Sequence, residues 1–241
     1  MSDSSAVRRA LADRLAGVVD RVAAATVASG RPAGAVTLVA VTKYMPVAWA
    51  RALVEAGCRD LGESRPQELW SKAAELADPA IRWHFIGHMQ RNKLRRSLPV
   101  ISLFHSVDSQ RLLAALDEEA AAAGRVVPAL LEVNISGDAN KTGFTAAEIA
   151  PLVDRLGDFA HVRIDGLMGM SGLEHSEAEA ERDFERLRTL RDELVGRLPA
   201  GAAWPHLSMG MSGDFEAAIR QGATLVRIGS ALTEGLRDSD G

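Results

Sequence analysis

The stretch Val36-Thr37-Leu38-Val39-Ala40-Val41-Thr42-Lys43 opens a series of short apolar runs that are rich in β-branched residues. It does not alternate between apolar and polar residues. Such continuous runs are typical of strands buried on both faces, as in a parallel sheet that helices cover. We therefore predict a strand over Val36–Val41, with Lys43 just beyond its carboxyl end.

Seven further runs of this kind follow, and the first four of the series start about 22 residues apart, room for one strand, one helix and two loops. They are Cys58–Leu61, Ile81–Ile86, Leu103–Val107, Pro128–Ile135, Val162–Met168, His206–Met209 and Ala223–Ile228.

Helical patterns occupy the stretches between these runs. Apolar residues recur at helical spacing over 4–28, before the first run, and again over 109–123, 145–157 and 176–198. Two of these segments begin with a capping box, in which a Ser or Thr is followed three residues later by Glu. The boxes are Thr145 with Glu148 and Ser176 with Glu179.

Eight strands alternating with helices in 241 residues predict an α/β fold, a single closed (β/α)₈ TIM barrel. We expect one domain over 1–241, with residues 1–30 as an extra N-terminal helix packed on the barrel. The competing architecture is an open doubly wound sheet. It is disfavoured because no G-x-G-x-x-G sequence follows the first strand.

The amino-acid composition is that of an ordinary globular protein and excludes several classes of partner and site. The chain is 47% hydrophobic and 25% charged, with a formal charge of −4, which argues against a nucleic-acid partner. Cys58 is the only cysteine, so neither an internal disulfide nor a multi-thiolate metal site is expected. Without a signal peptide or a long apolar segment, we expect a cytoplasmic protein with no membrane contact.

Two features point to a phosphorylated aldehyde as ligand. A lysine at the mouth of a dry barrel, such as Lys43, is a candidate for a Schiff base, because desolvation favours its neutral amine. Ser and Gly residues follow the last two strands, at 208–214 and 227–231, where barrels often bind phosphate. Pyridoxal 5′-phosphate is the commonest cofactor with both groups.

The chain resembles the pyridoxal phosphate homeostasis proteins, single-domain relatives of the alanine racemase barrel, from about residue 8 to 236. The resemblance rests on motifs in a fixed order: A-V-T-K-Y-M-P (40–46), L-G-E-S-R-P-Q-E (61–68), W-H-F-I-G-H-M-Q-R-N-K (83–93), N-I-S-G-D-A-N-K-T-G (134–143), G-L-M-G-M (166–170), H-L-S-M-G-M-S-G-D (206–214) and V-R-I-G-S (226–230).

This resemblance implies a fold-type III barrel that holds pyridoxal phosphate as a Schiff base on Lys43. The phosphate of the cofactor would be bound by Ser208, Ser212, Gly229 and Ser230. Arg227 would face the pyridine nitrogen and disfavour its protonation, which restrains carbanion chemistry. No residue is assigned a catalytic step, and no metal site is expected.

For some residues of the family motifs the resemblance implies no particular chemical step. They are His88, Gln90, Asn92 and Lys93 after the third strand, and Lys141 after the fifth. Ser64 departs from the family pattern, which usually has Asn in G-E-N-x-x-Q-E. The substitution puts any cofactor contact through that side chain in doubt.

Three functions compete. The family resemblance favours a carrier that buffers or delivers pyridoxal phosphate inside the cell, as a monomer, with PLP-dependent apoenzymes as candidate recipients. An amino-acid racemase would need a second acid or base, and the only tyrosine, Tyr44, adjoins Lys43. A Schiff-base aldolase acting on a sugar phosphate agrees with Lys43 and the phosphate loops but not with the full set of motifs.

Overall fold

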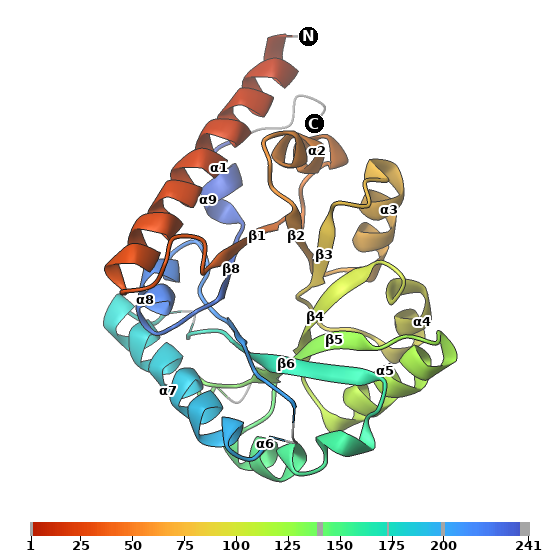
Figure 1. The fold of residues 1–241 in the computed structure, drawn as a ribbon. Coiled ribbons are helices and arrows are strands. Elements are labelled where there is room, and N and C mark those ends of the chain that lie inside the picture. The colour runs from red at the N-terminus through yellow and green to blue at the C-terminus, as the bar shows by residue number, and fades with distance from the viewer. Residues whose placement is uncertain (1, 139–141, 173, 199–200, 237–241) are drawn as a thin grey trace.

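The computed structural model describes residues 2–138, 142–172, 174–198 and 201–236. Eight parallel strands follow one another around a closed barrel in sequence order, and β1 pairs with both β2 and β8 (Figure 1). The predicted (β/α)₈ barrel is confirmed. The strands are β1 Thr37–Val41, β2 Asp60–Glu63, β3 Arg82–Phe85, β4 Ile101–Val107, β5 Val127–Val133, β6 Val162–Gly169, β7 His206–Ser208 and β8 Leu225–Ile228.

Helices surround the barrel, and the long helix α1, Ser2–Ala28, lies outside this ring against α2, α8 and α9 (Figure 1). The others are α2 Val47–Glu55, α3 Pro66–Leu76, η1 Arg91–Lys93, α4 Leu94–Ser97, α5 Gln110–Ala122, α6 Ala146–Val153, η2 Leu156–Asp158, α7 Glu177–Val195, α8 Phe215–Arg220 and α9 Ser230–Thr233. Among the described residues, no helix has the length and apolar character that crossing a membrane requires.

Element ends differ from the predicted ones by a few residues. Strand β2 starts at Asp60, two residues after Cys58, because its ladder to β3 begins with the pair Asp60 and Arg82. The helix predicted over 145–157 ends at Val153, shortly after Pro151, whose ring lacks an N–H group, and a short 3₁₀ turn follows. Both predicted capping boxes are confirmed.

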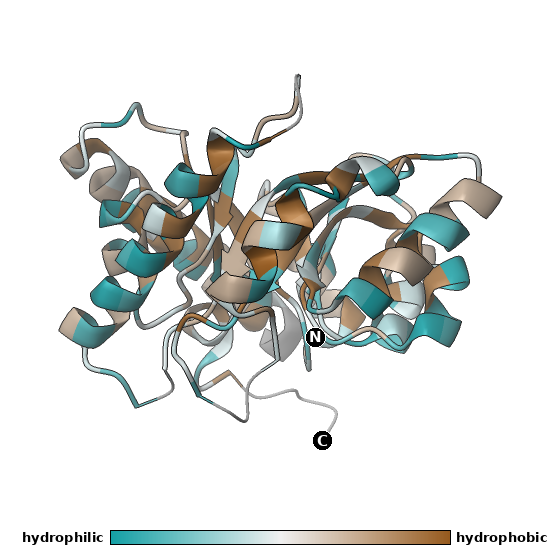
Figure 2. Cartoon of the chain, turned by 90° about the horizontal axis from the view of Figure 1, so that it is seen from below, coloured by the Kyte–Doolittle hydropathy of each residue, from teal (hydrophilic) through white to brown (hydrophobic). Residues whose placement is uncertain are grey.

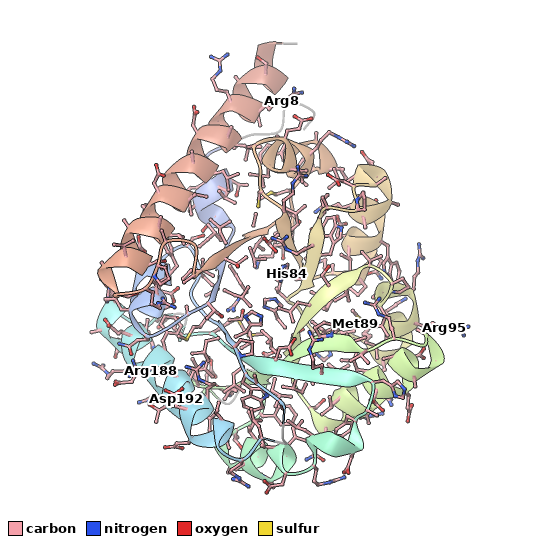
Figure 3. All side chains as sticks on the ribbon, in the orientation of Figure 1. Arg8, His84, Met89, Arg95, Arg188 and Asp192 are labelled. Carbon is pink, nitrogen blue, oxygen red and sulfur yellow. The ribbon has the colours of Figure 1, made fainter. Side chains whose placement is uncertain are left out.

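Two apolar layers hold the barrel together. The larger core lies between the strands and the helices, whose outer faces are mostly hydrophilic (Figure 2). A smaller cluster fills the inside of the barrel with one residue from each of five strands: Val39, Leu103, Leu130, Met168 and Leu225. Polar side chains share this interior, and His84 points into the ring of strands (Figure 3).

A buried ion pair lies behind the end of β1. Lys72 Nζ, on α3, donates to the Thr42 carbonyl at 2.7 Å and lies 2.6 Å from Glu63 Oε1 on β2. The Thr42 hydroxyl donates to the same carboxylate oxygen at 2.7 Å. All three residues are almost completely buried. This clamp of Thr42, Glu63 and Lys72 fixes the backbone immediately before Lys43.

We predict that Lys72→Met destabilises the protein by about 3–5 kcal/mol, because it leaves the Glu63 carboxylate buried without a countercharge. Urea unfolding measures the loss. The double variant Glu63→Gln/Lys72→Met should recover much of it, since no uncompensated charge remains. Arg95→Met, at an exposed position on α4, is the control and should change stability by less than about 0.5 kcal/mol. A Lys72→Met protein as stable as wild type would contradict the role of the clamp.

We also predict that the free energy of unfolding falls as the pH is lowered from about 7 to about 5. Burial lowers the pKa of His105 well below its ordinary value, and it lowers the pKa of His206 as well. The unfolded chain therefore takes up protons near pH 6.5 that the folded protein does not, at a cost of up to about 1.4 kcal/mol per pH unit for each histidine.

The measurement is urea unfolding as a function of pH. His105→Gln removes one of the two titrating groups and should make the dependence shallower. Equal slopes for wild type and variant would show that His105 does not resist protonation.

Candidate functional site

Lys43 lies at the carboxyl end of β1, where the structure leaves its side chain exposed. The chain turns sharply after it, because Tyr44 adopts a left-handed conformation with φ of 64°, which is uncommon for a residue other than glycine. The Tyr44 ring extends into solvent and lies 4.8 Å from the Arg65 guanidinium carbon. The turn leads into α2 and places Met45 and Trp49 beside Lys43.

The loops after β7 and β8 meet at the same end of the barrel. Ser212, in the first loop, accepts hydrogen bonds from the backbone N–H groups of Gly229 and Ala231, each at 3.2 Å. Ser230 is exposed at the first position of α9. The structure thus brings together Ser212, Gly229 and Ser230, three of the four residues predicted to bind phosphate.

Local contacts shape the loop after β7. Gly210 has φ of 90°, and a Cβ atom there would lie only 2.6 Å from the Cβ of Ala218, so the close turn toward α8 requires glycine. The Asp214 carboxylate then accepts from the Met211 N–H at 2.6 Å and from the Ser171 hydroxyl at 2.6 Å. These bonds hold Ser212 against the start of α9.

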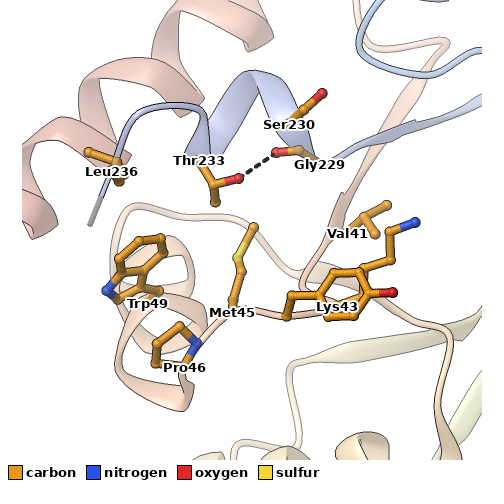
Figure 4. A pocket seen from close by; sticks show the side chains of 10 residues that line it. Val41, Lys43, Met45, Pro46, Trp49, Gly229, Ser230, Thr233 and Leu236 are labelled. Atoms are coloured by element: carbon orange, nitrogen blue, oxygen red, sulfur yellow. Dashed lines mark hydrogen bonds between the residues drawn. The ribbon is translucent and has the colours of Figure 1, made fainter. Parts of the chain in front are cut away.

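A pocket of about 460 Å³ joins Lys43 to α9 (Figure 4). The β1–α2 turn and the first turn of α2 form one wall, with Lys43, Met45 and Trp49, and α9 forms the other, with Ser230 and Thr233. Its size falls within the range of small-molecule sites, and it combines an amine, hydroxyls and apolar side chains.

Arg227 and Ser208 lie deeper, inside the barrel. The Arg227 guanidinium donates from Nη1 to Ser208 Oγ at 2.6 Å and from Nη2 to the Gly169 carbonyl at 3.1 Å. Burial lowers the pKa of Arg227 to about 10, so the side chain stays charged at neutral pH. Ser208 is completely buried and also contacts His105, so its hydroxyl is part of the interior rather than of the surface loop.

The motif residues after the third strand do not line this pocket. His88 is exposed and lies 2.9 Å from Asp108 through Nδ1, beside a second pocket that includes Gln90, whereas Lys93 lies over Trp70. Asn92 is exposed. Lys141 lies outside the described residues, and Ser64 is half-buried beside Gly87.

Sequence reasoning missed the buried polar residues that support the site. Lys72 lies on the buried stripe of α3 between Leu69 and Leu76, and a charge within an apolar stripe was the available signal. His105 lies in the buried strand β4, and the sequence does not indicate which side chains a histidine there would contact. Within the described residues, no cluster of three or more His, Cys, Asp or Glu side chains is arranged to bind a metal ion.

The residues present fit a phosphorylated aldehyde. Backbone N–H groups of Gly229 and Ala231 converge on one point, where the oxygen of Ser212 already accepts them, and such donors suit an anion. Gly229 lies close to β1, since a Cβ atom there would be 3.4 Å from the Cβ of Val41. Lys43, whose amine could take a carbonyl group, therefore borders the same pocket as Gly229 and Ser230, whose N–H and hydroxyl groups could take a phosphate.

Comparison with known proteins agrees with this geometry. Residues 21–236 match the family described as alanine racemase, N-terminal domain. The pyridoxal phosphate homeostasis protein of Pseudomonas aeruginosa is 40% identical over 228 residues, which cover 95% of this chain and 96% of the relative. The protein of the same name from Escherichia coli is 35% identical and covers 95% of this chain and 97% of its own length.

A solved structure is also similar to this chain over most of its length. PipY of Synechococcus elongatus with pyridoxal phosphate bound superposes with a TM-score of 0.80 at 35% identity, over 92% of this chain and 99% of that protein. These matches cover nearly the full length of both proteins, which confirms the resemblance found in the sequence motifs. The chain belongs to the family of the alanine racemase N-terminal domain, among the pyridoxal phosphate homeostasis proteins.

Proposed function

We propose that this protein binds pyridoxal phosphate through a Schiff base on Lys43 and acts in the cytoplasm as a monomeric carrier that holds the cofactor and releases it to apoenzymes. One observation carries the proposal: Lys43 borders the same pocket as Gly229 and Ser230 at the start of α9. The names of the relatives and the pyridoxal phosphate in PipY support the same ligand.

Each residue has a distinct task in this proposal. Lys43 supplies the amine for the aldehyde, while Ser212, Ser230 and the Gly229 N–H hold the phosphate. Ser208, also predicted to contact the phosphate, would do so from the barrel interior, where its hydroxyl accepts a hydrogen bond from Arg227. When bound, the cofactor would supply an electron sink for reactions of amino acids. Arg227, as a charged donor at the ring nitrogen, keeps that sink weak, because a proton there would add a second positive charge.

The exposure of the site favours storage and release over turnover. The Lys43 side chain is open to solvent, so water or a free amine can reach the carbon atom that it binds. Racemisation instead needs an acid or base on each face of a closed site. The single tyrosine, Tyr44, contacts the Arg65 guanidinium and is largely exposed where it lines the pocket, so it does not close the site.

We predict that borohydride reduction of the complex attaches one pyridoxyl phosphate group to Lys43. Peptide mapping by mass spectrometry locates the label. Lys43→Ala should abolish the label, whereas the control Lys93→Ala, on η1, should leave it unchanged. Label scattered over surface lysines of the wild-type protein would contradict the assignment of Lys43.

The same loaded protein separates the carrier from the racemase. A carrier restores activity to an apoenzyme that needs pyridoxal phosphate and leaves L-alanine unchanged. Conversion of L-alanine to the D form at a rate abolished by Lys43→Ala would replace the carrier proposal with the racemase.

We further predict that the phosphate contacts contribute more to affinity than the ring contact. Ser212→Ala/Ser230→Ala removes two hydroxyls from a charged group and should weaken binding about 100-fold or more, at roughly 1.5–3 kcal/mol each. Arg227→Ala removes one ring contact and should cost about tenfold. Fluorescence titration gives both affinities, and the reverse order would contradict the role of Arg227.

A further inference from the structure

Six side chains form one continuous hydrogen-bonded network through the inside of the barrel. We call it the interior network, and it consists of Arg227, Ser208, His105, His84, Asp60 and Arg82. It passes from β8 through β7, β4 and β3 to β2. Its first five members are buried, and only Arg82, at the start of β3, reaches the surface.

The distances are short along the whole network. Arg227 Nη1 lies 2.6 Å from Ser208 Oγ, which lies 2.8 Å from His105 Nδ1. His105 Nε2 is 2.8 Å from His84 Nδ1, and His84 Nε2 is 3.0 Å from Asp60 Oδ1. The two imidazole rings meet edge to face.

The two ends set the direction of the outer hydrogen bonds. A guanidinium can only donate, so Ser208 accepts from Arg227, and a carboxylate can only accept, so His84 donates from Nε2 to Asp60. Burial lowers the pKa of His105 well below its ordinary value, so this ring donates from one nitrogen and accepts at the other. The hydrogen bonds that His105 makes to Ser208 and His84 therefore change direction together.

Asp60 completes the network as an anion. Burial alone would raise the pKa of this carboxyl group, but hydrogen bonds from His84 and Arg82 outweigh that effect and hold the pKa below its ordinary value. The network thus joins a buried cation at one end to a carboxylate at the other through Ser208 and two histidines.

This connection matters because Arg227 has no ion pair with a carboxylate among the described residues. Its hydrogen-bond partners are the Ser208 hydroxyl and the Gly169 carbonyl, while Asp214 and Glu132 act on it through longer-range attraction. Without the network, one of its two hydrogen-bond partners would be free to turn. Apolar residues would fill the same space with less desolvation cost, so packing alone does not account for two buried histidines.

We propose that His105, His84 and Asp60 are positioning residues for the cofactor ring: acting through Ser208, they hold the Arg227 guanidinium in place so that the ring nitrogen stays unprotonated. This inference rests on the proposed function, because it requires that pyridoxal phosphate occupies the site with its ring nitrogen toward Arg227. It extends the site to residues that lie two to four hydrogen bonds from Arg227.

The test uses the full-length protein loaded with pyridoxal phosphate that carries ¹⁵N in its ring. The ¹⁵N resonance distinguishes a protonated from an unprotonated ring nitrogen. We expect wild type to show the unprotonated nitrogen near pH 7. In His105→Leu the resonance should move toward the protonated form, and affinity should fall about three- to tenfold, the effect of roughly one hydrogen bond.

Three further variants separate positioning from packing. His105→Gln keeps an acceptor for Ser208 and a donor for His84 and should restore the wild-type resonance. Asp60→Asn removes only the distant charge and should shift the resonance in the same direction as His105→Leu, though less. The control His206→Leu removes a half-buried histidine outside the network and should have no effect on the ring.

The outcomes are distinct. If His105→Leu does not fold, Asp60→Asn decides, since it preserves the shape of the side chain. A ring nitrogen that is identical in wild type, His105→Leu and Asp60→Asn overturns the inference while the carrier function stands. A wild-type protein that binds no pyridoxal phosphate overturns both.

Discussion

The closure of β1 against β8 is the constraint on which the site depends. In the closed ladder Val39 pairs with Arg227 and Ala40 pairs with Ile228, although nearly the whole chain separates them. The residues that follow each strand therefore emerge side by side, Lys43 from one and Gly229 with Ser230 from the other. An open sheet would leave these two strands far apart. Lys43 meets Gly229 and Ser230 because the barrel closes, and neither loop makes the pocket alone.

Two polar arrangements support this junction from below. The clamp of Thr42, Glu63 and Lys72 fixes β1 where Lys43 leaves it, and the interior network fixes Arg227 on β8. Both place charge in the interior, which costs desolvation free energy that apolar residues would not incur. The barrel thus combines an apolar filling with two polar supports, each directly beneath a residue assigned to the cofactor.

The sequence predicts the barrel and its helices better than it predicts the buried polar contacts that support the site. The apolar runs and the capping boxes depend on local chemistry, so the barrel, its strand order and the helix starts follow from them. The contact between His84 and His105 depends on the register of β3 against β4, which shifts between Trp83 and His84. Such a shift leaves no local mark in the sequence. Likewise, the sequence predicts Ser208 as a phosphate ligand but does not indicate its buried hydrogen bond to His105, which depends on the packing of β4 and β7.

The hydroxyl of Ser212 has a consequence for loading and unloading. It already accepts hydrogen bonds from the N–H groups of Gly229 and Ala231, so neither donor lacks a partner when no phosphate is bound. A phosphate that takes those N–H groups replaces the hydroxyl oxygen as their acceptor, and the hydroxyl can then turn its own hydrogen toward the phosphate. When the phosphate leaves, the two N–H groups return to the hydroxyl. The start of α9 therefore keeps its backbone donors hydrogen-bonded both with and without a ligand, and neither state leaves them without a partner.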